Sequence, residues 1–400
     1  MNLSDTEIEL FLSGHDMIWD FPPTRWQESP FIGNGLTGTM PIFDLENNSI
    51  KWFLGRTDVG KLDFPGKARN SIRTQIGSLI QVFPKDIRLT GCSLRLDLWN
   101  AEISGKILTS AGEMDLRALA PSGSASFIIE MTNTNRLKWS WKPEIKAEGQ
   151  ILDGGNFSTF FVEDFVSHPR TEVASGGFAV VWGEKNTEND SCRFICSIGS
   201  TPVNRRLWND NDSGISAREE AETDFKRYFQ EKIDLIVREH RKWWHNFYHS
   251  SFFSFSNFEL ESFYWIQVYK FASTTRPDRP MIDNHGIWST NSTYGFATWD
   301  YNVQATYRMH LTANFADFGK PLLKFLEDNF NEKSMWNEEY GEYRAGMRQQ
   351  TFLRYRFFDK KFWEHGEEMP CEGPAKFLWG VHNYLMHYRH SLDPAMIQIG

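Results

Sequence analysis

The segment AREEAETDFKRYFQEKIDLIVREHRKWWHNFYHS (217–250) separates two parts of this chain that differ in character. Its first turns are acidic and its later turns are basic, which is the charge order that the helix dipole favours. Apolar residues recur in it at helical spacing: Phe225, Tyr228, Phe229, Ile233, Ile236 and Val237. Ser216 precedes the segment and can cap it. We therefore predict a connecting helix between an upstream domain and a helical downstream domain.

Upstream of this segment, from about residue 19 to residue 202, short alternating runs are separated by Gly, Asn, Asp and Pro. Each run has the length of a strand and is rich in β-branched or aromatic residues. The clearest runs are GSLIQVF (77–83), SLRLDLW (93–99), AEISGKI (101–107), ASFIIEMT (125–132) and GFAVVWG (177–183). Many such runs at short spacing predict an antiparallel β-sandwich over residues 1–203.

Downstream, the polar loop NRRLWNDNDSG (204–214) opens a linker that we place at 204–252. Four later stretches have helical patterns: 257–273, 300–315, 320–330 and 374–390, the last with Pro374 suited to a first turn. A closed barrel of twelve helices needs about 300 residues or more. Only about 150 residues follow residue 250. Residues 253–400 are therefore expected to form the first helices of an incomplete (α/α)6 barrel.

Composition and charge exclude several classes of function. The net charge is −9 and the pI is about 5.7, without a basic cluster that could follow a phosphate backbone, so no nucleic-acid partner is predicted. No run approaches the ~20 apolar residues that span a bilayer, so no membrane partner is predicted either. The first residues lack a signal-peptide pattern, which predicts a cytoplasmic protein as written, or an extracytoplasmic one if the true start lies upstream.

Cysteines and aromatic residues have ordinary structural interpretations. The four cysteines form no CxxC pair, and we interpret all of them as reduced core residues: Cys92, Cys192, Cys196 and Cys371. The chain holds 16 Trp, 33 Phe and 12 Tyr. Such rings either fill a core or stack on the faces of sugar rings, and composition alone favours the core.

Three segments resemble one family of carbohydrate-active enzymes. FIGNGLTGTM (31–40) is similar to the PIGNGxxGAM stretch of family-95 glycoside hydrolases, the α-L-fucosidase and α-L-galactosidase group. Arg276 with WDYNVQATYRM (299–309) resembles that family's Arg-Pro and DYHxNINxxM sequences. LWGVHNYLMHYRHSLD (378–393) resembles its AWLxxHxWxHYxxTxD helix, with matches at Trp379, His387, Tyr388 and Asp393. The resemblance implies a six-hairpin glycosidase fold and an oligosaccharide or glycan substrate.

The resemblance also implies catalytic positions, and the chain departs from the family there. Two asparagines of the family's DYHxNIN stretch hold and polarise the attacking water of an inverting exo-glycosidase. The matching positions are Gln304 and Thr306, while Asn302 stands at the family's histidine and Asn383 at the first histidine of the third segment. We take Asn302, Gln304 and Thr306 as candidate catalytic residues. The general acid is not identified within these 400 residues.

Residues just before these positions are candidates for substrate binding. Asp300 shares a pocket with Gln304 if 299–304 is extended or enters a helix; otherwise it is a helix cap. Trp288 either stacks on a pyranose ring or packs in the core, and Trp299 flanks the same pocket. His285 either bonds a sugar hydroxyl or is a structural histidine. The sequence predicts one cleft lined by Trp288, Trp299, Asp300, Asn302 and Gln304.

The loop FWEHGEEMPCEG (362–373) carries the other acidic candidates. It is either a solvated loop or the wall of a subsite, with Glu367 or Glu368 as a carboxylate near the cleft. Glu368 and Trp379 of the following helix are taken as candidate substrate-binding residues. His365 lies among these acids, but without HxH or HExxH spacing, so we predict no metal. The sequence also contains no motif for a nucleotide or other cofactor.

Two hypotheses from different classes remain. The first is a glycoside hydrolase, α-L-fucosidase-like, or the N-terminal part of one. The second is a non-catalytic carbohydrate-binding remnant of a six-hairpin glycosidase, because the positions that hold water are altered. A polysaccharide lyase on a similar helical fold is a weaker third, kept open by Arg276 and Arg279. The sugar, the linkage and the oligomeric state stay open.

Overall fold

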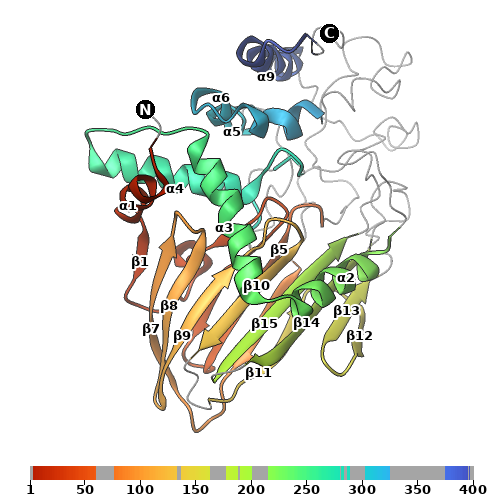
Figure 1. Ribbon diagram of the computed structural model, residues 1–400. Helices are drawn as coiled ribbons and strands as arrows, with labels where there is room; N and C mark the ends of the chain where they lie inside the picture. The colour runs from red at the N-terminus through yellow and green to blue at the C-terminus, as the bar shows by residue number, and fades with distance from the viewer. Residues whose placement is uncertain are drawn as a thin grey trace.

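The computed structural model describes residues 3–59, 76–132, 137–162, 177–187, 190–200, 215–279, 281–282, 286–288, 302–324, 374–394 and 396. In this part of the chain, two antiparallel sheets form a sandwich and the helices gather over one face and one end of it (Figure 1). This arrangement confirms the predicted β-sandwich followed by a partial helical domain.

The larger sheet has nine strands in the order β1-β7-β8-β9-β10-β15-β14-β13-β12. Their bounds are β1 Met17–Trp19, β7 Leu89–Asp97, β8 Glu102–Thr109, β9 Gly112–Leu119, β10 Ser126–Thr132, β15 Ser191–Ser200, β14 Phe178–Thr187, β13 Ser158–Val162 and β12 Gln150–Asp153. The smaller sheet has six strands, in the order β11-β6-β5-β3-β2 with β4 beside β5. Their bounds are β11 Ser140–Ile145, β6 Gly77–Val82, β5 Ser49–Arg56, β3 Thr37–Thr39, β2 Ile32–Gly33 and β4 Pro41–Asp44. Each of the five runs chosen from the sequence contributes to one of these strands.

The sandwich core follows from residue alternation along the strands. Leu94 and Leu96 of β7 are buried, and Ile103 and Ile107 of the neighbouring β8 join them. Arg95, between the two leucines, is turned to the other face and pairs with Asp16. Successive side chains of a strand point to opposite faces of the sheet. The alternation therefore places the apolar side chains of β7 and β8 together on the face that lies in the core.

The predicted single helix 217–250 is wrong in one respect, because the structure contains two helices there. α2 is Ala217–Gln230 and α3 is Ile233–His249, separated by Glu231 and Lys232 in extended conformation. The prediction that Ser216 caps the first helix is confirmed, since its side chain accepts a hydrogen bond from the backbone N–H of Glu219. The apolar face of α2 packs on the large sheet, whereas α3 runs away from the sheet towards α4. The two extended residues between the helices allow this change of direction.

α2 lies flat on the outer face of the large sheet (Figure 1). Its Ala221 and Phe225 pack on Val181 and Ile195 of β14 and β15. The helix can approach this closely because residue 199 is glycine: a Cβ there would overlap the carbonyl oxygen of Ala217. Part of the segment that we expected to be linker therefore belongs to the packed sandwich.

α3 runs from the sandwich to α4 (Phe258–Thr274) and is tied to the sandwich through hydrogen bonds. Both ring nitrogens of His240 lie against backbone carbonyl oxygens, those of Ala120 at 3.1 Å and Asn100 at 3.0 Å. Arg241 donates two bonds to Glu102, and the Tyr248 hydroxyl donates to the Leu98 carbonyl at 2.7 Å. In this interface the buried polar side chains named here all lie at hydrogen-bond distance from a partner, and a neutral His240 ring donates to one side only.

The N-terminal helix α1 (Asp5–Ser13) belongs with the helical part, although it precedes the sandwich in sequence. A capping box of Ser4 and Glu7 starts it. Just after it, the ring of His15 lies between Ser262, at 2.8 Å, and Glu261, at 3.2 Å, on α4. The first residues of the chain thus brace α4 rather than extend the sheets.

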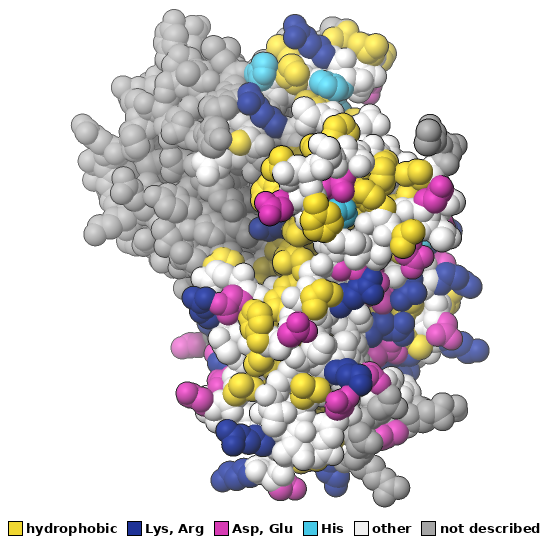
Figure 2. All heavy atoms as spheres, turned by 90° about the vertical axis from the view of Figure 1, so that its left-hand side faces the viewer, with side chains coloured by type: hydrophobic (Ala, Val, Ile, Leu, Met, Phe, Trp, Pro, Cys, Tyr) yellow, Lys and Arg dark blue, Asp and Glu magenta, His cyan; other side chains and the backbone are white. Residues whose placement is uncertain are grey.

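The outer face of α4 carries exposed apolar side chains. Leu260 and Phe263 are 60% and 63% exposed, and Leu10 of α1 is 75% exposed. In the space-filling view, hydrophobic side chains gather over the helical part of this face (Figure 2). Among the described helices, none is long and apolar enough to cross a membrane.

The remaining described elements are short except for the last. The predicted helix 300–315 is instead two short helices, α5 (Asn302–Thr306) and α6 (Met309–Thr312), as far as its residues are described. The 3-10 helices are η1 (Trp26–Glu28) and η3 (Ala316–Gly319), and residues 320–324 start a further helix. α9 (Pro374–Ser391) confirms the last predicted helix.

Candidate functional site

Two of the three segments that resemble glycosidase motifs lie against each other. α5 and α6 both contact α9, far along the chain. The side-chain amide of Asn383 on α9 donates to the backbone carbonyl of Gln304 on α5 at 3.1 Å. The Gln304 side chain is fully buried, and Asn383 is nearly so. The structure thus brings a candidate catalytic residue together with a position of the third resembling segment.

The other two candidate catalytic residues are less enclosed. Asn302 is exposed at the start of α5. Thr306 is half-buried, and its hydroxyl donates to the backbone carbonyl of Asn302 at 2.9 Å. This local bond satisfies the threonine hydroxyl within its own helix, as is common for Thr in helices.

Two buried histidines extend the same cluster. His310 on α6 and His387 on α9 have ring centres 5.8 Å apart and planes inclined by 38°. Gly319 of η3 lies between them: a Cβ there would collide with Nε2 of His310 and come within 2.8 Å of Nδ1 of His387. Glycine at this position therefore leaves room between the two rings.

Several polar atoms of this cluster are buried without a hydrogen-bond partner in the part of the chain that the structure describes. They are both ring nitrogens of His310, Nδ1 of His387 and Oδ1 of Asn383. Burial lowers the pKa of His310 to about 3, helped by the neighbouring His387, and it lowers the pKa of His387 as well. Both rings are neutral at pH 7.

Tyr307 anchors this cluster to the end of α4. Its buried hydroxyl accepts a hydrogen bond from the backbone N–H of Ile282 at 3.0 Å and lies 3.3 Å from the hydroxyl of Thr275. Next to Thr275, the guanidinium of Arg276 stacks over the ring of Trp243 on α3 at 3.5 Å. Arg276 and Tyr307, which both belong to the second resembling segment, are therefore held at the end of α4 by packed side chains.

Trp288 is packed in the core, which is one of the two interpretations that the sequence allowed. It is 5% exposed, and its indole N–H donates to the carbonyl of Ile32 at 2.8 Å. Its ring packs on Phe31 in a small cluster with Met40, Phe53 and Ile287. Gly33 and Gly38 make room for it, since a Cβ at either would meet the indole. Its stacking on a sugar would require this core to open.

Four candidates lie outside the described residues: His285, Trp299, Asp300 and Glu368. Trp379 is on α9, but its side chain is also outside the described part. The predicted common cleft is thus described only at Trp288, Asn302 and Gln304. Of the cysteines, Cys92, Cys192 and Cys196 are free and buried, as expected, and burial raises their thiol pKa values.

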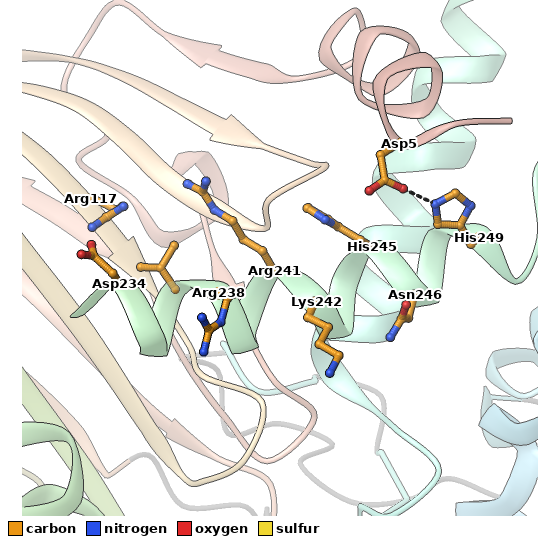
Figure 3. A pocket seen from close by; sticks show the side chains of 10 residues that line it. Asp5, Arg117, Asp234, Arg238, Arg241, Lys242, His245, Asn246 and His249 are labelled. Atoms are coloured by element: carbon orange, nitrogen blue, oxygen red, sulfur yellow. Dashed lines mark hydrogen bonds and ion pairs between the residues drawn. The ribbon is translucent and has the colours of Figure 1, made fainter. Parts of the chain in front are cut away.

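A separate polar cleft of about 620 Å³ runs along the exposed side of α3 (Figure 3). Two of its cations are already paired, Arg117 with Glu130 and Arg241 with Glu102. Of its carboxylates, Asp5 is bonded to His249, and Arg238 is paired with the neighbouring Glu239. The ten side chains that line it include no Trp, Tyr or Phe that could stack on a sugar. We therefore place the candidate site at the cluster of α5, α6 and α9.

Sequence reasoning did not identify His310 as part of the cluster of α5, α6 and α9. It named His387 only as a match to the third resembling segment. The spacing of Asn383 and His387, one helical turn apart on α9, was an available signal. The approach of His310 to His387 had no local signal, because the two residues are far apart in the sequence.

Comparisons with known proteins bear on the fold. No protein-family model matches the sequence, and no curated protein matches it. Among solved structures, the chain is similar to a protein from the human microbiome described as a kojibiose phosphorylase. The TM-score is 0.50 at 13% identity, over 83% of this chain and 46% of that one. It is also similar to a bacterial glucoamylase in complex with acarbose, with a TM-score of 0.39 at 8% identity over 80% and 54%. The chain therefore spans about half the length of these proteins.

Proposed function

We propose that this chain carries the sugar-binding face of a glycoside-cleaving enzyme of the glycoside hydrolase type, acting on an oligosaccharide. The observation that carries the proposal is the contact of Gln304 with Asn383. It joins two segments that resemble glycosidase motifs and are far apart in sequence. Support also comes from the fold, which is similar to that of a protein described as a kojibiose phosphorylase.

Within this proposal, Gln304 orients the attacking water of an inverting exo-glycosidase. Its side chain is fully buried, and the amide of Asn383 holds its backbone carbonyl. A side chain confined by burial loses little further entropy when it positions a reactant. An α-L-fucoside is the first substrate to test, because the sequence resemblance points to it.

The alternative is a carbohydrate-binding remnant without catalysis, and one contact favours it. The resemblance places Thr306 at the second water-holding position, yet its hydroxyl bonds to the carbonyl of Asn302 in its own helix. If that position is inactive, sugar binding remains while cleavage is lost.

Gln304→Ala separates these possibilities when aryl glycosides, α-L-fucoside included, are assayed with and without inorganic phosphate. We expect kcat to fall by roughly 100-fold while KM changes little, because a positioned polar group acts on the transition state. The matched control is His382→Gln, at an exposed position next to Asn383, which should leave both constants unchanged.

Calorimetric titration with the same sugars completes the test. Binding without release of the aryl group supports the remnant. Cleavage that requires phosphate points to a phosphorylase instead of a hydrolase. Neither binding nor cleavage of any sugar tested contradicts the proposed function.

A further inference from the structure

The histidine pair between α6 and α9 has a chemistry that sugar binding does not use. Nε2 of His310 and Nδ1 of His387 border the same small space, the one that a side chain at residue 319 would fill. Neither nitrogen has a hydrogen-bond partner in the described chain. Leaving such a buried group unsatisfied costs about 1–3 kcal/mol, so a pair of them calls for an explanation.

We propose that His310 and His387 bind one divalent transition-metal ion of the kind that prefers imidazole nitrogen, with Zn²⁺ as its probe. Two imidazoles that share a tetrahedral zinc ion through nitrogens about 2.0–2.1 Å away have ring centres on the order of 5 Å apart. The observed separation of 5.8 Å is close to that value. Only a small approach of α6 to α9 is needed for both nitrogens to reach the ion.

The charged side chains of the neighbouring segment are engaged with each other. Lys320 and Asp317 form an ion pair at 2.7 Å. His390, one turn beyond His387, has its Nδ1 at the carbonyl of Met386.

Asn383 supplies the third ligand. It lies one turn before His387 on α9, and its Oδ1 is buried without a partner, while its amide nitrogen is held by Gln304. Among the described residues, no group of three or more His, Cys, Asp and Glu side chains could hold a metal. The protein therefore contributes two imidazoles and one amide oxygen, and water completes the coordination.

All three protein ligands are neutral, so they leave the positive charge of the ion uncompensated. This lowers the expected affinity. We expect a Kd for Zn²⁺ on the order of 10 µM, weaker than for structural sites with four protein ligands, several of them thiolates. Mg²⁺, which prefers oxygen ligands and keeps its waters, should not bind. This inference does not depend on the proposed sugar chemistry.

Calorimetric titration of the 400-residue chain with ZnCl₂ tests the site, with MgCl₂ as the matched control cation. His310→Gln and His387→Gln should each weaken Zn²⁺ binding more than about tenfold, because each removes a ligand. Gly319→Ala should do the same by filling the space with a methyl group. His382→Gln, at an exposed histidine of the same helix, should bind as the unmodified chain does.

Crystals of the unmodified chain soaked in ZnCl₂ give a readout that needs no variant. An anomalous peak between His310 and His387 supports the site even if a variant fails to fold. No peak there overturns the proposal, as does Zn²⁺ affinity that is the same in His310→Gln, His387→Gln and the unmodified chain.

Discussion

The docking of α3 on the sandwich and the meeting of α6 with α9 both bury histidines, but they treat them differently. His240 places each ring nitrogen against backbone carbonyls, and Arg241 and Tyr248 on the same helix are also bonded across the interface. His310 is just as deeply buried, yet neither ring nitrogen has a partner in the described chain. Bonded polar groups hold two parts of a fold together, whereas unbonded buried ones call for an explanation, of which a ligand is one.

The largest expected effect compares His240→Ala with His310→Leu. His240→Ala removes a buried ring and leaves carbonyl oxygens without a donor, so the free energy of unfolding should fall by about 3 kcal/mol. His310→Leu removes unsatisfied nitrogens and keeps apolar volume, so it should change stability by less than about 1 kcal/mol. Urea unfolding followed by circular dichroism, with EDTA present, measures both. Equal losses in the two variants would contradict the contrast.

The second effect concerns pH and His240. Burial, with the charge of Arg276 nearby, lowers the pKa of His240 to about 3, whereas the unfolded chain has the ordinary value near 6.5. The stability that this neutral ring contributes is fully present above pH 6.5 and is lost as pH falls towards 3. Between pH 6.5 and 4, the unmodified chain should lose about 2–3 kcal/mol more than His240→Gln does.

Urea unfolding of both proteins at several pH values in that range checks this prediction. The three carbonyl oxygens around His240 oppose the effect of burial, since they stabilise the protonated ring. Parallel curves for the two proteins would mean that these oxygens prevail and that His240 is not neutral in the folded state.

The smallest expected change in stability comes from a single hydrogen bond between α3 and the sandwich. Tyr248→Phe deletes the hydroxyl that donates to the Leu98 carbonyl and leaves that oxygen buried, which should cost about 1–2 kcal/mol of unfolding free energy. Tyr264→Phe, on α4, is the control, because no partner in the described chain bonds its hydroxyl. Thermal unfolding of the two variants side by side distinguishes them, and equal melting temperatures would remove Tyr248 from the interface argument.

Local sequence patterns predicted much of the fold. The alternation of β7 and β8 fixes which side chains face the core, and the capped, amphipathic pattern of α2 fixes its start at Ser216. The break at Glu231 and Lys232 was not predicted, because both residues are compatible with a helix. It is decided by packing, since α2 must follow the sheet whereas α3 must leave it.

For the candidate site, too, some features follow from the sequence and others only from tertiary packing. The sequence by itself determined that a β-sandwich precedes helices, the positions of five strands and of most of the longer helices, and Gln304 as a residue to test. Tertiary structure decided that Trp288 is covered by Ile32 and Phe31, and that Asn383 and His387 of α9 meet Gln304 and His310. The physical reason is distance along the chain. Hydrophobic periodicity acts within one element, whereas the partners of a buried polar group are chosen only when remote elements pack together.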